Sequence, residues 1–533
     1  MNLKFVVWSL NKISVLASYL FHMPFKEFIP NKMILYNWMR INLFKIAATI
    51  SIVSCLILIV VKVYFSLSFL PDMSGSETST IFPIQFLADN RPVYSNPENA
   101  PFRFTQYTPL YFLFTNLLLE INGWLPDDVH KVFVSNRFVS MALTVLTALV
   151  LAFFLIKLTK RKRITGMLTA CLVFQVLAFW ILTSSRPDSL IVLLTALYVC
   201  AVFKAITSTS KNDLWYILAI FISVTAFFVK QSGTIHAIAL ALFCVYQYQW
   251  KLLAKLILSG LVFFAFYFLI LPTNSIPVFF SNIIGGVENS VSWDWFYDWT
   301  LEKFLLQFAP LIICNFIITF YSLIREESAF YRFLAIASSM FFLFATATAF
   351  KIGAGVGYYQ DYLIIAAIQI TLFFTEPKRK NLFQPKILRA LLASYLIIVA
   401  IHCTLFVYMT YQNQPHSLYT HQYFKEKEVA NFLINDKKLV DKEWVYVCDG
   451  DNFQGVYLKH FLFRNVLVPF TDIVYLADKN KTFNFQNFES LVKQNKIRFV
   501  VAKKGDTPKN ILGYKFPDLK RINTIDEYDI YEQ

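Results

Sequence analysis

Long apolar runs separated by short polar connections fill most of the chain between residues 46 and 411. Many of the runs approach or exceed the roughly 18–20 residues that a helix needs to cross a lipid bilayer. Strands of a membrane barrel alternate polar and apolar positions over about ten residues, whereas these runs are longer and continuous. The pattern therefore predicts an α-helical polytopic membrane protein with about eleven membrane-spanning helices, at 46–69, 136–157, 164–183, 188–206, 214–231, 233–250, 256–272, 302–323, 330–350, 361–375 and 389–411.

The composition of the 533-residue chain agrees with this pattern. Hydrophobic residues make up 57% and charged residues only 16%, which is far less charge than a soluble protein carries. The net charge of +15 lies mainly in the short connections, where it indicates topology rather than nucleic-acid binding. No basic-aromatic module typical of nucleic-acid recognition is present, and the cysteine spacing predicts neither a disulfide framework nor a metal site.

The distribution of Lys and Arg predicts how the chain is oriented in the membrane. Cations gather in KLTKRKR (157–163), WKLLAK (250–255) and EPKRKNLFQPKILR (376–389), whereas the connection 273–300 has none. Cationic connections stay in the cytosol. We therefore expect residues 1–45 to form a cytosolic leader that lies along the membrane surface, and the tail and the opposite connections to lie outside.

One apolar segment, 108–125, is long enough to raise doubt about this topology. If it crossed the membrane, KLTKRKR would lie outside and every later connection would invert its charge bias. We therefore interpret 108–125 as a helix on the outer face. Residues 71–135 then form one large first outer loop of the membrane domain, which spans 46–411.

The tail, residues 412–533, has more polar residues and shorter apolar runs. KEVANFLIND and NFESLVKQN have helical patterns, and EWVYVCD and IRFVVAKK have strand patterns. The tail is therefore predicted to be a small α/β domain outside the cytosol. It contains no Gly-rich phosphate loop and no nucleophile elbow, so we expect it to be structural or to cap the substrate.

Ionisable residues at the outer ends of the spans are candidates for function. Each residue also has a structural interpretation that needs no function. Arg and Lys can extend to lipid phosphates, Asp188 can cap a helix, and Glu77 can be a solvated loop acid. Together they suit one chemistry, because a carboxylate can take a proton from a hydroxyl nucleophile and cations can hold a phosphate as it leaves. The set comprises Glu77, Asp89, Arg91 and Arg103 in the first loop, Arg186 and Asp188 in TSSRPDSL, Lys230 in VKQSGT, and Lys351 and Asp361 around KIGAGVGYYQD.

Several short motifs occur in a characteristic order between about residue 45 and residue 375. After Glu77 come ADNRPVY (88–94), TPLYF (108–112), SNRFVS (135–140), RPD (186–188), KQSG (230–233) and KIGAGVGYY (351–359). This order resembles the membrane-embedded glycosyltransferases of the GT-C superfamily, in the bacterial branch related to protein mannosyltransferases and to the aminoarabinose transferase of lipid A. Thr108 stands where the family has Pro, and Gly357 stands where it has Asn.

The resemblance implies transfer of a sugar from a polyprenyl-phosphate donor to a glycan, lipid or protein acceptor, with inversion, at the bacterial inner membrane. Glu77 would be the general base and Asp72 the reserve candidate. The other implied site residues would bind substrate or, in the case of Asp188, orient a cation: Arg103, Tyr107, Arg186, Asp188, Lys230, Lys351 and Tyr358. The resemblance requires no cofactor, and it leaves open whether a divalent metal is used and which acid is the base.

Three other functions fit parts of the pattern. A flippase or transporter of lipid-linked sugars would also use a basic cavity, but inverted repeats or paired broken helices would be expected and none is evident. A polysaccharide polymerase or ligase would have its large loop late in the chain, whereas here the loop is early. A catalytically silent scaffold of the same fold is the third alternative.

Overall fold

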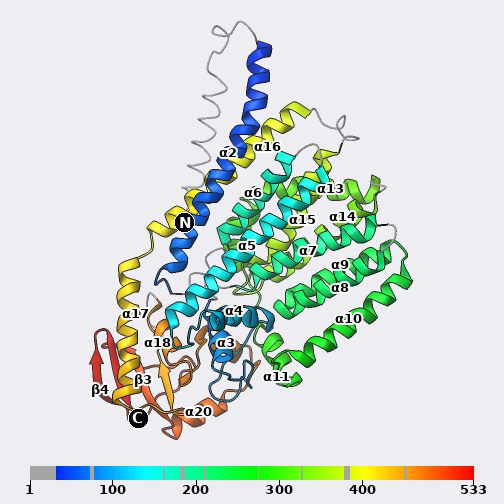
Figure 1. Cartoon of the computed structure of the whole chain (residues 1–533). Helices are drawn as coiled ribbons and strands as arrows, with labels where there is room; N and C mark the ends of the chain where they lie inside the picture. Colours follow the sequence, from blue (N-terminus) through cyan, green and yellow to red (C-terminus); the bar gives the residue numbers. More distant parts are fainter. Residues whose placement is uncertain are drawn as a thin grey trace.

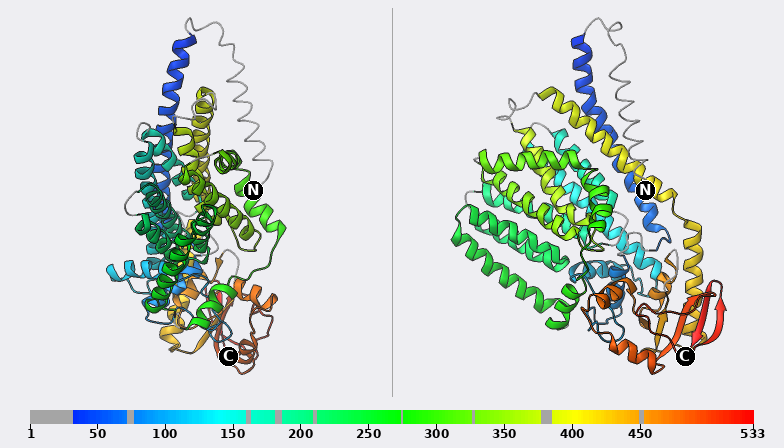
Figure 2. Two further views of the ribbon diagram at one scale, coloured as in Figure 1. Left: turned by 90° about the vertical axis from the view of Figure 1, so that its right-hand side faces the viewer. Right: turned by 180° about the vertical axis from the view of Figure 1, so that it is seen from behind.

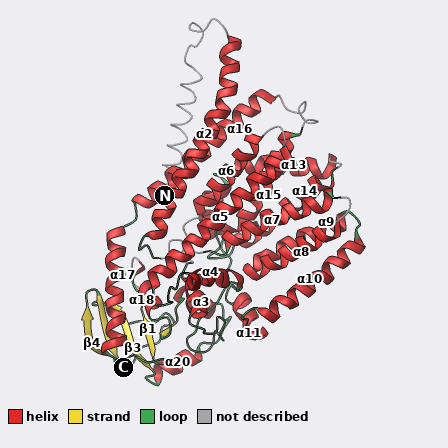
Figure 3. Ribbon diagram, viewed as in Figure 1, coloured by secondary structure: helices red, strands yellow, loops and turns green. Residues whose placement is uncertain are grey.

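The computed structural model describes residues 32–71, 77–159, 163–180, 186–208, 212–273, 275–325, 328–376, 385–448 and 453–533. Most of the predicted leader and the reserve acid Asp72 lie outside the described residues. Long helices run side by side through most of the molecule, and the strands lie together beyond one end of them (Figures 1 and 3). The two further views in Figure 2 show the same separation.

Each predicted span corresponds to a helical segment. The long helices are α2 (Lys32–Leu67), α5 (Val129–Thr159), α6 (Arg163–Trp180), α7 (Asp188–Thr207), α8 (Asn212–Val229), α9 (Thr234–Tyr246), α10 (Trp250–Ile270), α13 (Ala309–Arg325), α14 (Ala329–Ala349), α15 (Gln360–Thr375) and α16 (Pro385–Gln412). The polytopic helical fold is therefore confirmed.

Length and composition qualify fewer helices as complete spans than the predicted number. Within the described residues, 7 helices are long and apolar enough to cross a membrane, or up to 8 if one bent pair counts as a span. That pair, Trp293–Leu305 and Ala309–Arg325, is bent by 83°. It falls where the sequence predicts a single span at 302–323, and the bend follows a π-helical segment, a common site of helix distortion.

The membrane helices bury one face and leave the other apolar and exposed. On α10 only Leu256 and Tyr267 are buried, while Leu258, Leu261 and Leu269 on the same helix are exposed. An exposed apolar surface of this extent is typical of contact with lipid or with another protein. The outer helices of the bundle therefore carry the surface that a bilayer would cover.

Short helices occupy the connections at the end of the bundle nearest the strands. In the first loop these are α3 (Thr78–Ala88) and α4 (Leu110–Ile121), and α4 is shorter than a bilayer span requires. Later connections contain η1 (Gln231–Gly233), α11 (Ile276–Phe280), η2 (Ser281–Gly285), α12 (Trp293–Phe296), η3 (Tyr297–Leu305) and η4 (Val356–Tyr359).

The tail folds as an α/β unit around a five-stranded sheet of order β2-β1-β3-β5-β4. Strands β1, β2 and β3 are parallel, whereas β5 runs antiparallel to both β3 and β4. All four elements predicted for the tail are present. The elements are α17 (His416–Asn431), η6 (Phe432–Asp436), β1 (Trp444–Val447), α18 (Val456–Phe461), β2 (Val466–Leu467), α19 (Thr471–Lys479), α20 (Gln486–Lys493), β3 (Ile497–Lys503), β4 (Lys520–Ile525) and β5 (Tyr528–Glu532).

The first loop supplies part of the core of this unit. Phe82 and Phe86 of α3 belong to the apolar cluster on one side of the sheet, and Phe102 and Phe104 belong to the cluster on the other side. Fully burying a Phe side chain contributes about 1.5–3 kcal/mol. The first loop and the tail therefore form one packed body at the end of the helical bundle.

Polar contacts hold the same two segments together. Arg464 donates to Asp89 (2.6 and 2.8 Å) and to Asp127 (2.7 and 3.1 Å). The buried His460 ring lies 2.8 Å from the side-chain oxygen of Gln85 in α3. These contacts fix the position of the first loop over the helix ends that carry the predicted site.

Candidate functional site: a buried cluster of cations

Asp188 lies at the centre of the cluster, where α7 begins. Pro187 precedes it, a residue whose fixed φ suits the first turn of a helix. The Asp188 carboxylate accepts hydrogen bonds from Lys230 Nζ at 2.8 Å and Arg186 Nε at 3.2 Å. Asp188 and Lys230 are both buried, so one carboxylate links two cations within the protein.

A sharp turn after α8 directs Lys230 toward Asp188. Lys230 has an extended backbone, and η1 begins at the next residue. A Cβ atom at Gly233 would lie 2.4 Å from the Ala226 carbonyl oxygen, so this turn requires glycine. Burial alone would lower the pKa of Lys230, but the Asp188 carboxylate more than reverses this and raises it above its usual value, so Lys230 stays charged.

Two tyrosines face the Lys230 ammonium group. Its Nζ lies 4.4 Å from the ring centroid of Tyr358 and 5.7 Å from that of Tyr107, which are distances that permit cation–π attraction. A Cβ atom at Gly357 would lie 3.1 Å from Asp188 Oδ1 and 3.3 Å from Arg186 Nη2. Gly357, a departure from the family pattern, therefore allows the Tyr358 turn to approach the cluster closely.

Lys351 is the third cation near this cluster. It is half-buried and forms an isolated β-bridge with Val291. Burial, and then the positive charge of Lys230, lower the pKa of Lys351 to about 8. No ion pair of Lys351 is found within the described residues, so its charge remains for a bound anion.

The cavity inside the cluster is small in this conformation. Its volume is about 10 Å³, and its walls include Asp188, Lys230, Gly357, Tyr358 and Asp361. A cavity needs about 10–15 Å³ to hold one water molecule. A phosphate group would therefore have to move side chains apart, or bind at the edge of the cluster beside Arg186 and Lys351.

Glu77 lies in a separate buried ion pair. Arg137 of α5 donates to its two carboxylate oxygens at 3.0 and 2.8 Å, and neither side chain is exposed. Arg137 also donates to the backbone carbonyls of Ser68 and Leu70 at the end of α2. The structure thus places Glu77 where the chain leaves its first long helix, and its catalytic role stays a prediction.

Arg103 also makes its contacts away from the cation cluster. Its guanidinium carbon lies 3.5 Å from the ring centroid of Phe86, and its Nη2 donates to the Pro92 carbonyl. Burial, and then the positive charge of Arg91, lower the pKa of Arg103 to about 9. The predicted site residues that the structure brings together are Tyr107, Arg186, Asp188, Lys230, Lys351 and Tyr358, whereas the described contacts of Glu77 and Arg103 lie elsewhere.

No role was assigned from the sequence to three polar residues that the structure buries, Arg137, Thr195 and His236. Arg137 was visible in SNRFVS but had no assigned partner. Thr195 and His236 lie inside apolar runs, yet they join Asp361 in a buried hydrogen-bonded chain. A polar residue in the middle of an apolar span is itself a sign of function, and Thr195 and His236 both carry that sign.

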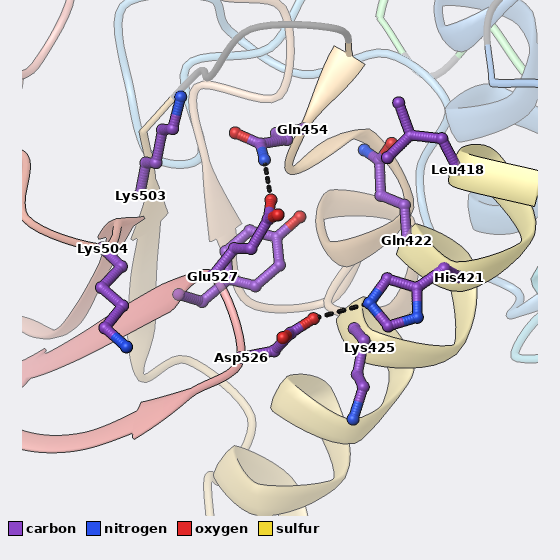
Figure 4. Close-up of a pocket in the computed structure, with 10 residues that line it drawn as sticks. Leu418, His421, Gln422, Lys425, Gln454, Lys503, Lys504, Asp526 and Glu527 are labelled. Carbon is purple, nitrogen blue, oxygen red and sulfur yellow. Dashed lines mark hydrogen bonds and ion pairs between the residues drawn. The ribbon is translucent and has the colours of Figure 1, made fainter. Parts of the chain in front are cut away.

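A larger cavity of about 470 Å³ lies in the tail, between α17 and the β4–β5 hairpin. Figure 4 shows its carboxylates already engaged: Asp526 pairs with His421 at 2.8 Å, and Glu527 accepts from Gln454. None of the predicted site residues lines it. Within the described residues, no group of three or more His, Cys, Asp or Glu side chains is placed to hold a metal ion.

The whole fold, with its helical bundle, large first loop and α/β tail, is shared with solved structures of other proteins. The structure is similar to that of ArnT from Cupriavidus metallidurans in the apo state, with a TM-score of 0.53, 12% identity, and coverage of 91% of this chain and 98% of that chain. It is also similar to the oligosaccharyltransferase AglB from Archaeoglobus fulgidus in complex with an inhibitory peptide and a dolichol-phosphate, with a TM-score of 0.53, 12% identity, and coverage of 88% and 69%. The sequence itself matches no protein-family model and no curated protein. The expected fold is confirmed.

Proposed function

We propose that the protein transfers a sugar from a polyprenyl-phosphate-linked donor to an acceptor outside the cytosol, with inversion at the sugar. The observation that carries the proposal is the pairing of Arg186 and Lys230 with one carboxylate, Asp188, beside a third cation, Lys351. Even with the negative charge of Glu288, which acts on Lys351, the three cations leave an excess of positive charge at a partly buried site. Such a site favours an anion, and phosphate is one of the anions that Arg and Lys bind in proteins.

The position of the cluster favours a phosphate that carries a lipid. Asp188 and Lys230 lie at adjoining ends of α7 and α8, two helices that qualify as membrane spans. A headgroup bound there would leave its apolar chain beside the helices, in the bilayer. AglB, which has the same fold, was solved with a dolichol-phosphate, and a lipid phosphate of this kind is the ligand proposed here.

In the proposed reaction the acceptor hydroxyl attacks the anomeric carbon on the face opposite the phosphate. A loop carboxylate takes the hydroxyl proton, and Arg186, Lys230 and Lys351 stabilise the negative charge that develops on the departing phosphate. Glu77 can act as the base only if its ion pair with Arg137 opens. Asp72 remains the alternative, and the acceptor is a glycan, a lipid or a protein.

The first experiment compares surface glycans and glycolipids, by mass spectrometry, in cells with and without the protein. A missing sugar, with accumulation of its exported lipid-linked donor, is the expected result. Loss of donor export would instead support a flippase, and a shortened polysaccharide chain would support a polymerase.

The second experiment tests the cluster directly. Lys230→Met in reconstituted protein should lower transfer by about 10²-fold or more, the usual effect of removing one group that stabilises developing charge. Lys255→Met is the matched control, because Lys255, near the start of α10, is an exposed lysine paired with Asp213 of α8. Equal activities of the two variants would contradict the proposed role of the cluster.

A further inference from the structure

Behind the cation cluster, three buried polar residues from three helices form a continuous chain. The Thr195 hydroxyl of α7 lies 2.6 Å from Asp361 Oδ1 of α15 and 2.8 Å from His236 Nε2 of α9. Thr195 and His236 are fully buried and Asp361 nearly so. Both distances are those of good hydrogen bonds, so each requires a hydrogen atom between its two heavy atoms.

The hydrogen positions follow from the partners of His236. Its Nδ1 lies 2.9 Å from the Gly233 carbonyl oxygen, which can only accept, so Nδ1 carries a hydrogen. If Nε2 is unprotonated, the Thr195 hydroxyl donates to it, and Asp361 must then donate to Thr195 as a carboxylic acid. If Nε2 is protonated, His236 is an imidazolium and the Thr195 hydroxyl donates to an Asp361 carboxylate.

Either arrangement holds one proton more than a carboxylate beside a neutral imidazole. The Thr195 hydroxyl also lies 3.0 Å from the Ile191 carbonyl. If its hydrogen pointed there, both Asp361 and His236 would have to donate, and the proton count would rise further. One extra proton is therefore the minimum that these hydrogen bonds allow.

Burial decides where this proton resides. Separating charge onto two fully desolvated groups is costly, whereas a neutral acid beside a neutral imidazole avoids that cost. The charged groups that face Asp361 are Asp188 and Lys230, and they already form an ion pair with each other. The neutral arrangement, with Asp361 as a carboxylic acid, is thus favoured.

Asp361 also lines the small cavity that it shares with Asp188, Lys230 and Tyr358. We propose that Asp361, Thr195 and His236 form a hydrogen-bonded chain that holds one proton beside the cation cluster, and that Asp361 donates it to the phosphate of a lipid-linked ligand. This inference rests on the proposed function for its ligand. It assigns to the site an acid that is distinct from the loop carboxylate serving as base.

In the transfer step, a bond forms between the acceptor oxygen and the anomeric carbon. The bond from that carbon to the phosphate oxygen breaks, and its electron pair stays on the phosphate. The loop base takes the acceptor's proton and releases it to water, Asp361 gives its proton to the phosphate, and Asp361 regains a proton from water at the small cavity once the lipid phosphate has left. The products are the glycosylated acceptor and a singly charged lipid phosphate, so charge and protons balance.

Infrared difference spectroscopy of the full-length protein in nanodiscs tests the proton count without any turnover. The wild type should show a carboxylic-acid C=O band that Asp361→Asn removes and that Thr195→Val shifts. Asp213→Asn is the matched control and should leave the band in place, because Asp213 is exposed and paired with Lys255. An unchanged spectrum in Asp361→Asn, or loss of the band in Asp213→Asn, would overturn the assignment.

The donation is tested by adding a short-chain polyprenyl phosphate at about pH 8, where a free phosphate monoester, with a second pKa of about 6, is doubly charged. The Asp361 band should disappear as the lipid phosphate saturates the protein. A bound lipid phosphate with an undiminished band contradicts the donation alone. Failure of the wild type to bind the lipid phosphate contradicts both the donation and the proposed function, but leaves the proton count of the free protein measured.

Discussion

The buried pair of Glu77 and Arg137 offers a test that separates a structural role from a catalytic one. Arg137 donates two hydrogen bonds to Glu77, at 3.0 and 2.8 Å, and neither side chain is exposed. A hydrogen bond to a charged group contributes about 1.5–3 kcal/mol. The summed contribution of two such bonds agrees with the loss of stability, about 3–5 kcal/mol, that follows removal of one partner of a buried ion pair.

We therefore expect Glu77→Leu and Arg137→Met each to lower the free energy of unfolding by about 3–5 kcal/mol, because each leaves an uncompensated buried charge. The double variant removes both charges and should recover part of this loss, leaving about 1–3 kcal/mol because the carbonyls of Ser68 and Leu70 lose their hydrogen bonds from Arg137. Equilibrium unfolding in mixed micelles, followed by tryptophan fluorescence, measures all four proteins under the same conditions. The reasoning is refuted if either single variant lies within about 0.5 kcal/mol of the wild type, which is the range of an ordinary surface substitution.

The same variants report on the catalytic base. If the stable double variant transfers sugar at a normal rate, Glu77 is not the base and Asp72 becomes the leading candidate. If the double variant is folded but inactive, Glu77→Gln with a normal unfolding profile provides the confirming measurement. Transfer by that Gln variant at wild-type rate would exclude Glu77 from the mechanism.

Three further predictions concern the cluster and its support. Burial lowers the pKa of Lys351 to about 8, so its positive charge is lost as the pH rises through 8. Calorimetry should therefore show that binding of polyprenyl phosphate weakens from pH 7 to pH 9 in the wild type. In Lys351→Arg the binding should stay the same over this range. Gly357→Ala should weaken the same binding, because the new methyl group would lie 3.1 Å from Asp188 Oδ1. The expected loss is about tenfold or more, the effect of losing one net hydrogen bond to a charged group. Gly355→Ala is the control and should bind as the wild type does, since no atom lies within 4 Å of its added Cβ. Arg464→Ala removes the hydrogen bonds to two first-loop carboxylates. It should speed amide hydrogen exchange in α3, relative to the wild type, without changing exchange in α10. An exchange rate in α3 equal to that of the wild type would contradict the proposed link.

Much of the architecture could be predicted because its causes are local. The length of each apolar run limits where a helix can cross a bilayer, and the period of the tail distinguishes its strands from its helices. The predicted convergence of Arg186, Asp188 and Lys230 also follows from local facts, since these residues lie at span ends that topology assigns to one side. In the structure Asp188 forms ion pairs with both Arg186 and Lys230.

Other features depend on contacts between segments far apart in the chain. Glu77 and Arg137 are separated by 60 residues, and Thr195 and Asp361 by 166. Sequence patterns give the type of each residue but not its partner, so Glu77 could not be distinguished from a solvated loop acid. The shared core of the first loop and the tail escaped prediction for the same reason, since Phe102 and Phe104 resemble ordinary loop aromatics until they pack beside the sheet.

The amino-acid sequence by itself determined that this is a helical membrane protein with a polar tail and a set of cations at one end of its spans. It did so because hydrophobic length and charge bias act residue by residue. Only the tertiary structure decided which carboxylate each cation meets, which acids are closed off in ion pairs, and where a shared proton must lie. Those outcomes depend on distances of about 3 Å between side chains from different helices, and helix packing alone sets such distances.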